Sequence, residues 1–343
     1  MSAGLQVLAP GLHTTVQDLG RPGYQAIGVP VSGALDGFSL RLANALVGNP
    51  PGTPVLEVLM SGPTFEVAAE TARVALAGVG ASLAVGAEKM PAGAWQSVTL
   101  PRGKVIEVVV GRQSASCYLA VEGGIAVPLT LGSASTYVRA AIGGLDGRAL
   151  RRGDFMPLAM AGASHRAELR LSSPIVATGD QPIRVVLGPQ QEYFTEEAVA
   201  AFLGAEFRIS QSADRMGMRL DGPFLQHRRG WDIVSDAIVT GAIQVPGSDQ
   251  PILLLADHQT TGGYPKIATV ISADLPVVGR RRPSDTLRFA AVTVETAEEL
   301  CRAEERRLAE FVAALEPVPA SHTVDVASLY SGNLISGVVS GLE

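Results

Sequence analysis

The chain has 343 residues, 47% apolar and 17% charged, which is long enough for two domains and too apolar for a disordered protein. Its 27 Lys and Arg against 33 Asp and Glu give a net charge of −6 without a basic block, so we expect no binding to nucleic acid or to an anionic membrane. Two cysteines, Cys117 and Cys301, are too few for a disulfide scaffold or a four-cysteine zinc site.

The first residues lack the pattern of a signal peptide, and no apolar run reaches the roughly 18 residues of a membrane span. Together with the low cysteine count, this predicts a cytoplasmic protein.

Short runs rich in β-branched residues recur along the chain between turn-forming residues, a pattern typical of strands. The 38 Gly and 22 Pro are spread throughout, as expected for many turns. We predict strands over 73–76, 105–110, 183–187, 238–245, 252–255, 268–271 and 286–289.

Three helices are predicted, each opened by a residue type that caps helix N-termini. They run from Asp36 toward Gly48, over 196–203 after Thr195, and from Thr296 to about Leu315. Glu299 completes a capping box with Thr296. The tail over 320–343 is polar and is expected to be peripheral.

A polar stretch over 161–181 predicts a boundary between two domains. We expect a first module over 1–175, a second over 176–295, and a C-terminal helix and tail over 296–343. A weak similarity between the segments 32–36 and 214–221 favours two modules derived by duplication, with chance as the alternative.

Familiar motifs are absent: the sequence has no phosphate-binding P-loop, no dinucleotide-binding glycine motif and no nucleophile elbow. The five histidines show no metal-ligand spacing, so no metal site is expected. The candidates for chemistry are instead four polar, glycine-rich stretches.

The first stretch, 13–23, places Thr15, Gln17, Asp18 and Arg21 before a Pro-Gly turn. A functional surface is one interpretation. The alternative is a capped turn with an internal Asp18–Arg21 ion pair.

The second stretch, 28–36, holds Ser32 and Asp36 among small residues that would let a ligand or another backbone come close. The alternative assigns both side chains to capping the following helix. Both interpretations can hold together.

The third stretch contains Asp236 and the strand pattern around Gln244. Ile243 and Val245 are apolar, so the Gln244 amide points to the opposite face, where it either looks into a pocket or contacts a neighbouring strand.

The fourth stretch, Asp257-His-Gln-Thr-Thr-Gly-Gly-Tyr-Pro-Lys266, follows an apolar strand. Its two glycines allow backbone N–H groups to face an oxyanion. Lys266 supplies a positive charge, and Asp257 can orient a donor or accept a proton. An ordinary strand–turn–strand segment is the alternative.

Within this stretch, Thr260-Thr-Gly-Gly-Tyr-Pro-Lys-Ile-Ala268 resembles the signature of the biotin-dependent carboxyltransferase / allophanate hydrolase subunit 2 family. Further matches follow in order between residues 10 and 290. They include Thr14-Thr-Val-Gln-Asp-Leu-Gly-Arg-Pro-Gly23, Gly28-Val-Pro-x-Ser-Gly-Ala-x-Asp36, Gly132-Ser-x-Ser-Thr136, Asp214-Arg-Met-Gly-x-Arg-Leu-x-Gly-Pro223 and Gly241-Ala-Ile-Gln-Val-Pro246. The sequence departs at Ser284, where the family usually has Gly, and at Arg280, where Gln is frequent.

The resemblance implies a mainly β fold of two cyclophilin-like β-barrel modules with a few helices. Within the family, the sequence is most similar to the C subunits of 5-oxoprolinases. This implies a protein that opens 5-oxo-L-proline to L-glutamate with ATP as co-substrate, accompanied by magnesium. The implied partners are a B subunit of related fold and, in some members, a third subunit.

Two alternatives are kept. The first is carboxyl transfer from carboxybiotin to urea or a related amide, with biotin carried on another chain. The second is a non-enzymatic regulatory partner of a kinase-inhibitor protein. In both enzymatic interpretations a small lactam or amide is the substrate.

We hypothesise that the site has a catalytic group, a substrate-binding group and a first-module group. The catalytic residues are Asp257, Gln259, Tyr264 and Lys266. The substrate-binding residues are Thr260, Thr261, Gly262 and Gly263, with Arg215, Asp236 and Gln244 from neighbouring loops. The first-module or partner-facing residues are Thr15, Gln17, Asp18, Arg21, Ser32 and Asp36.

Overall fold

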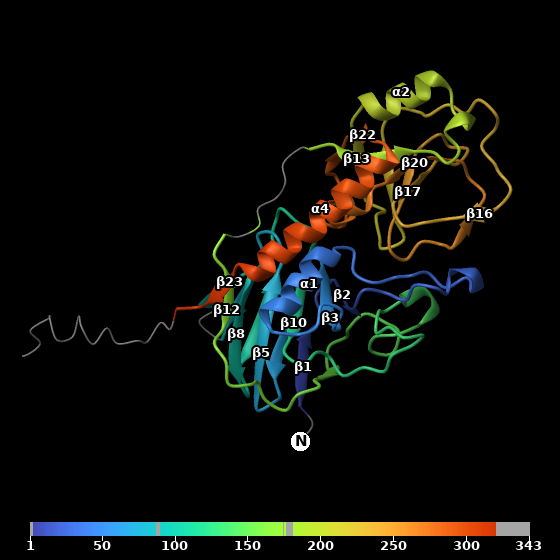
Figure 1. Ribbon diagram of the computed structural model, residues 1–343. Helices are drawn as coiled ribbons and strands as arrows, with labels where there is room; N and C mark the ends of the chain where they lie inside the picture. The colour runs from blue at the N-terminus through green and yellow to red at the C-terminus, as the bar shows by residue number, and fades with distance from the viewer. Residues whose placement is uncertain (1–2, 87–89, 174, 176–180, 320–343) are drawn as a thin grey trace, which may run out of the picture.

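The computed structural model describes residues 3–86, 90–173, 175 and 181–319, arranged as shown in Figure 1. Within these residues the protein is mainly β, as predicted. Its α-helices are α1 (Gly37–Leu46), α2 (Glu196–Gly204), α3 (Leu275–Gly279) and α4 (Val294–Ala313). Short 3-10 helices are η1 (Gln25–Ile27), η2 (Val138–Ala140), η3 (Gln191–Tyr193) and η4 (Ser272–Asp274).

Two antiparallel sheets build the N-terminal module. The six-stranded sheet has the order β11 (Phe155–Pro157), β1 (Gly4–Ala9), β4 (Thr64–Val67), β9 (Val105–Val109), β6 (Ser82–Val85) and β7 (Met90–Gly93). The seven-stranded sheet has the order β2 (His13–Gln17), β3 (Val55–Leu59), β10 (Ser116–Val121), β5 (Thr71–Ala77), β8 (Gln96–Pro101), β12 (Leu169–Leu171) and β23 (Leu315–Pro317).

Strand β10 is buried along its whole length because both of its faces are covered. Leu119 and Val121 point into the core between the two sheets. Tyr118 and Ala120 alternate with them and pack under α1 and α4 on the other face. This explains why the strand is a continuous apolar run rather than an alternating one.

An eight-stranded sheet builds the C-terminal module. Its order is β21 (Thr286–Leu287), β14 (Phe207–Ile209), β15 (Gly217–Asp221), β18 (Ile252–Leu254), β17 (Ala242–Gln244), β20 (Lys266–Val270), β13 (Ile183–Leu187) and β22 (Phe289–Ala291). Phe202 stacks on Phe289 with ring centroids 4.6 Å apart in its core. A separate strand pair, β16 (Asp236–Ala237) and β19 (Thr261–Gly262), lies outside this sheet.

The predicted strand over 238–245 is wrong in extent, since only β17 forms there. Gly241 adopts a left-handed φ of 88°, and the Ala242 N–H donates to the Val239 carbonyl, so a turn precedes β17. The Ile238 N–H instead donates to the Thr260 carbonyl and joins this segment to the fourth polar stretch.

The first two helices begin where predicted. Asp36 caps α1 by accepting a hydrogen bond from the Ser39 N–H at 2.9 Å, and Thr195 caps α2. The predicted end of α2 before Gly204 is one residue short, because Gly204 belongs to the helix.

The predicted start of the last helix at Thr296 is wrong. Thr293 is the N-cap, and its hydroxyl accepts from the Thr296 N–H at 3.2 Å, so α4 begins at Val294. The helix ends at Ala313 rather than at Leu315, because Leu315 opens β23 and pairs with Leu171.

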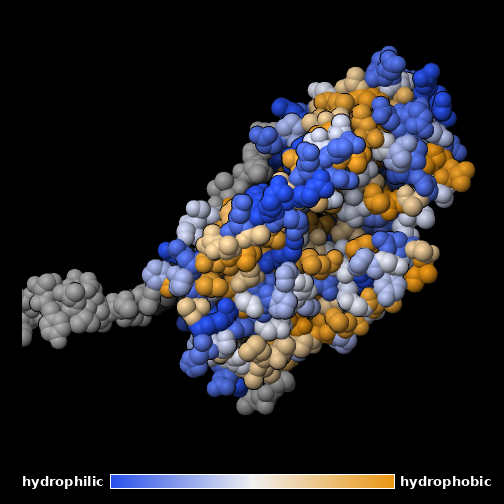
Figure 2. Space-filling view, viewed as in Figure 1, coloured by the Kyte–Doolittle hydropathy of each residue, from blue (hydrophilic) through white to orange (hydrophobic). Residues whose placement is uncertain are grey.

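Helix α4 links the two modules. Figure 1 shows it running from the C-terminal module back across the N-terminal one, where β23 pairs with β12. Its outer face is hydrophilic, as Figure 2 shows. The range 161–181, predicted as a boundary, contains β12, and the predicted tail over 320–343 lies outside the described residues. No helix in the described part of the chain is both long and apolar enough to cross a membrane.

Candidate active site

Lys266 opens strand β20 and carries a buried ammonium group. Its side chain is 4% exposed, and Nζ donates to Oδ2 of Asp236 at 2.9 Å. The amide of Gln190 donates to the same oxygen at 3.1 Å, and its Oε1 accepts from the Lys266 backbone N–H. These hydrogen bonds, that from Lys266 foremost, hold the pKa of the exposed Asp236 carboxyl below its ordinary value.

Gln244 lies opposite Lys266 on the neighbouring strand β17, which directs both side chains to one face of the sheet. Gln244 is buried, and its Oε1 accepts no hydrogen bond from the described residues. A Cβ built on Gly262 would lie 3.6 Å from this oxygen and 3.6 Å from Nε2 of Gln259. The same Cβ would lie only 2.6 Å from Cδ1 of Ile238, so the chain at Gly262 packs closely over the cluster. An unused acceptor therefore lies beside a buried cation. We call Gln190, Asp236, Gln244, Gln259, Gly262 and Lys266 the lysine cluster.

The strand pair β16–β19 holds this cluster together. Asp236 is the register partner of Gly262, and Ala237 is the partner of Thr261. The Thr260 and Gly263 carbonyls accept from backbone N–H groups of the 233–238 segment. The chain around Asp236 is thus fixed against the fourth polar stretch.

Two aromatic residues border the lysine cluster. The rings of Trp231 and Tyr264 lie 6.2 Å apart, and Tyr264 is 37% exposed. Both rings are therefore available to contact a substrate or a second chain.

Asp257 belongs to a different network, buried at the junction of the modules. Arg215 binds its carboxylate in a bidentate manner, with Nε and Nη2 at 2.9 and 3.1 Å from the two oxygens. Nη2 also donates to the Gly33 carbonyl at 2.7 Å, and Nη1 donates to Glu57. Burial lowers the pKa of Arg215, but the two carboxylates outweigh that effect and raise it, so the guanidinium stays charged.

The network extends through the N-terminal module. Glu57 Oε2 accepts from the Tyr118 hydroxyl at 2.8 Å, and that hydroxyl accepts from the Asp36 N–H at 2.8 Å. Asp36 Oδ2 in turn accepts from Nε of Arg280 at 2.6 Å. We call Arg215, Asp257, Glu57, Tyr118, Asp36 and Arg280 the junction network. Its members come from both modules, and their hydrogen-bonding groups are largely satisfied.

A pocket of about 370 Å³ opens beside the junction network. Arg215 and Asp257 line it together with His13 and apolar side chains such as Leu59 and Met216. Nδ1 of His13 is buried without a partner among the described residues. Burial, reinforced by the charge of Arg215, lowers the pKa of His13.

The residues predicted from the first polar stretch are buried inside the N-terminal module. Asp18 accepts from the hydroxyls of Ser133 and Ser135 and from the Ala134 and Gly20 N–H groups, at 2.5–2.8 Å. Asp18 therefore organises the 133–135 turn.

The Asp18–Arg21 ion pair, one of the two interpretations of that stretch, does not form. Arg21 instead donates to the Ser135 and Thr130 carbonyls. The Gln17 amide donates to Thr15 and to the Thr136 carbonyl. Thr15, Gln17 and Arg21 are all at most 1% exposed.

Ser32 has a left-handed φ of 56° and lies between the modules. Its N–H donates to the Ala256 carbonyl, but its hydroxyl has no partner among the described residues. Asp36, and not Ser32, caps α1.

Four residues of these networks, Glu57, Tyr118, Gln190 and Arg280, are not among the predicted site residues. Tyr118 reaches Glu57 because β3 and β10 pair, and Glu57 in turn accepts from Arg215 of the other module. Gln190 reaches Lys266 from the segment after β13. An isolated glutamate in the apolar run Val55–Leu59 was a usable signal for Glu57, since a buried charge needs a buried partner. Gln190 gave no comparable signal.

Two known proteins are similar in sequence to this chain over most of their length. It is 35% identical to the C subunit of 5-oxoprolinase from Escherichia coli (strain K12) over 299 residues, which cover 85% of this chain and 93% of the relative. It is also 35% identical to the C subunit of 5-oxoprolinase from Haemophilus influenzae over 88% of this chain and 95% of the relative.

Among solved structures, the urea carboxylase of Kluyveromyces lactis superposes with a TM-score of 0.82 at 30% identity. The match covers 90% of this chain but 29% of that protein, so this chain corresponds to under a third of the larger enzyme. The family described as "Carboxyltransferase domain, subdomain A and B" matches residues 27–291. The chain therefore belongs to the carboxyltransferase domain family.

Proposed function

We propose that this chain is one subunit of an ATP-dependent 5-oxoprolinase that opens the lactam of 5-oxo-L-proline to L-glutamate, and that it works with a B subunit of related fold. The two 5-oxoprolinase relatives, each matched over most of its length, support this assignment. The observation that carries it in the structure is the unused Gln244 acceptor on the strand beside the Lys266 ammonium.

A lactam presents one N–H donor and one carbonyl acceptor on the same side of its ring. In our proposal Gln244 Oε1 accepts from the lactam N–H, and Lys266 Nζ donates to the carbonyl oxygen. Lys266 then stabilises the negative charge that develops on that oxygen. Asp236, which is 46% exposed on its side chain, serves as the counterion that a ligand displaces or shares.

ATP is a co-substrate in this proposal, because an amide carbonyl is a poor electrophile and phosphorylation of its oxygen activates it. In our proposal the lysine cluster provides one cation, Lys266, beside that oxygen. Among the described residues no cluster of three or more His, Cys, Asp or Glu could hold a metal ion. In this proposal magnesium is bound chiefly by the phosphates of the nucleotide.

Of the two roles considered for Asp257, we favour orientation over proton transfer. Both of its oxygens already accept hydrogen bonds from Arg215, so the carboxylate is engaged within the protein. Its backbone N–H donates to the Arg215 carbonyl, so Asp257 fixes the start of the stretch that ends at Lys266.

We further propose that Trp231 and Tyr264 contact the partner subunit or the substrate at the edge of the lysine cluster.

We also propose that the protein acts in the cytoplasm. Two free cysteines and the use of ATP support that location.

Glutamate release from 5-oxoproline and ATP tests the proposed function. We expect release when the chain is combined with its partner subunits and none from the chain alone. Absence of release from a well-formed complex would contradict the proposal.

Carboxyl transfer is the second candidate, favoured by the match to urea carboxylase. The same complex supplied with carboxybiotin and urea would then form the carboxylated amide. A third hypothesis, a regulator that only binds its partner, predicts that Lys266→Ala leaves partner affinity and biological effect intact.

A further inference from the structure

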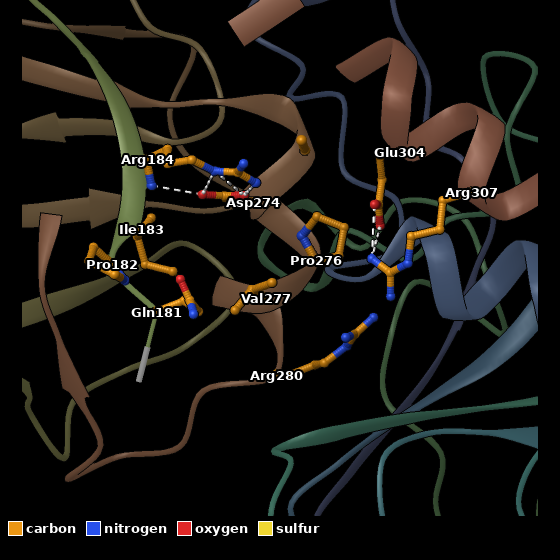
Figure 3. A pocket seen from close by; sticks show the side chains of 11 residues that line it. Gln181, Pro182, Ile183, Arg184, Asp274, Pro276, Val277, Arg280, Glu304 and Arg307 are labelled. Atoms are coloured by element: carbon orange, nitrogen blue, oxygen red, sulfur yellow. Dashed lines mark hydrogen bonds and ion pairs between the residues drawn. The ribbon is translucent and has the colours of Figure 1, made fainter. Parts of the chain in front are cut away.

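A second pocket lies where α4 crosses between the modules, and none of its lining residues belongs to the lysine cluster. It has a volume of about 210 Å³ and lies between α4, α3 and the start of β13 (Figure 3). Three arginines line it, Arg184, Arg280 and Arg307, each from a different element. Arg307 lies beyond residue 291, where the family match ends.

Arg307 lies at the edge of this pocket, against two aromatic rings. Its guanidinium carbon lies 5.1 Å from the ring centroid of Phe38 and 5.5 Å from that of Phe311. These two rings pack edge to face at 5.9 Å. Cation–π contacts of this kind fix the plane of a guanidinium without using its N–H donors.

Arg280 is held from the opposite side. Its Nε donates to the buried Asp36 carboxylate at 2.6 Å, while Nη2 makes a long contact of 3.5 Å with the Ser39 hydroxyl. Figure 3 shows the guanidinium groups of Arg280 and Arg307 turned toward one another. Each guanidinium is paired with one carboxylate, Arg280 with Asp36 and Arg307 with Glu304. An anion between them would therefore bind through their remaining N–H donors.

The two acids that line this pocket, Asp274 and Glu304, differ in the number of hydrogen bonds that they accept. The Asp274 side chain is 6% exposed. It accepts hydrogen bonds from Nε, Nη2 and the backbone N–H of Arg184, so it neutralises that arginine. Among the residues that the structure describes, Glu304 accepts only from Nη1 of Arg307, at 2.9 and 3.1 Å. In the described part of the chain, Nη1 of Arg280 and Nη2 of Arg307 donate to no side chain or carbonyl.

We propose that this pocket binds a small oxyanion, a carboxylate or a phosphate group, between Arg280 and Arg307. The planar fork of a guanidinium matches both groups, and paired arginines are a common way to hold them. Glu304 is the resident carboxylate that the ligand competes with for Arg307. Because α4 packs on both modules, an anion bound here joins α4 to α3 and strengthens the junction between them.

This proposal is tested on the full chain without partner subunits or turnover, so its outcome is independent of the proposed reaction. Isothermal titration would use inorganic phosphate in one arm and L-glutamate and acetate in the other, at low ionic strength. The variants are Arg307→Met, which keeps an apolar stem against Phe38 and Phe311, and Glu304→Gln. Arg302→Met, at an exposed position of the same helix, is the matched control.

We expect saturable binding of at least one probe by the wild-type chain. Arg307→Met should weaken it about tenfold or more, since it removes charge-assisted hydrogen bonds. Glu304→Gln should tighten it severalfold because the competing charge is lost, and Arg302→Met should leave it unchanged. The arm that saturates identifies the oxyanion as a phosphate or a carboxylate.

The absence of binding by the folded wild-type chain in both arms would overturn the proposal. Equal affinities of the wild type and Arg307→Met, with circular dichroism showing that both are folded, would overturn it as well. Weaker binding by Glu304→Gln would contradict the assigned role of Glu304.

Discussion

The lysine cluster and the junction network contain similar residue types but use them differently. In the junction network, Arg215 is shared between two carboxylates and a carbonyl, and its surroundings are buried. In the lysine cluster, the cation has a half-exposed counterion and a neighbouring acceptor without a partner among the described residues. Charges that are saturated inside the protein hold the modules together, whereas a buried acceptor without a described partner, beside a cation whose counterion is exposed, is a candidate to bind a ligand.

The comparison predicts the largest loss of stability in the junction network. Arg215→Ala leaves Glu57 and Asp257 as buried charges without a cation, which should lower the free energy of unfolding by about 3–5 kcal/mol. Arg41→Ala removes a more exposed pair with Glu305 and should cost at most about 1 kcal/mol. Chemical denaturation of both variants measures the difference, and equal losses would contradict the contrast.

Lys266→Ala should instead remove activity. The loss of one donor to a developing oxyanion lowers kcat by about 100-fold or more, and the exposed Asp236 left behind can be solvated. Glutamate release by the complex measures the effect, with Lys104→Ala as the control at another lysine. Activity within about twofold of the wild type would remove Lys266 from the site.

Gln244→Leu should act on substrate binding rather than on folding. The variant cannot accept the lactam N–H, so KM should rise by about tenfold or more. The free energy of unfolding should stay the same or increase, because a buried acceptor that no described residue satisfies is removed. A clear loss of stability with unchanged KM would show that Gln244 has only a structural role.

The smallest predicted effect concerns pH. Burial lowers the pKa of His13 from its ordinary 6.5, so the unfolded chain binds a proton more readily than the folded one. The contribution of His13 to stability is therefore fully present above pH 6.5 and decreases as the pH falls below it. Melting temperatures measured from about pH 7.5 to 5.5 should decline less steeply in His13→Gln, and an identical decline would show that His13 does not contribute.

The strands that the sequence predicts well are those whose amino-acid composition is typical of a strand. The run Ile183–Leu187 forms β13 with the same bounds, because β-branched residues between turns specify a strand locally. The predicted strand over 238–245 is wrong in extent because Gly241 creates a turn within it. The start of α4 was missed since Thr293 and Thr296 are both plausible caps by sequence, and the choice depends on where β22 ends.

The lysine cluster was partly predictable because Lys266, Gln259 and Gly262 are close in sequence, and the resemblance to a known family marked that stretch. The sequence did not indicate that Asp257, in the same stretch as Lys266, would pair with Arg215 instead. That pairing depends on the register of β15 against β18, which a single sequence does not encode locally.

The central claim is that Gln244 and Lys266 recognise the two sides of an amide. The most direct test compares kcat/KM for 5-oxoproline and for its N-methyl analogue, in complexes carrying wild-type chain or Gln244→Leu. We predict that the wild type prefers the N–H substrate and that this preference falls about tenfold or more in the variant, because Leu cannot accept the hydrogen bond. An unchanged preference would contradict the claim.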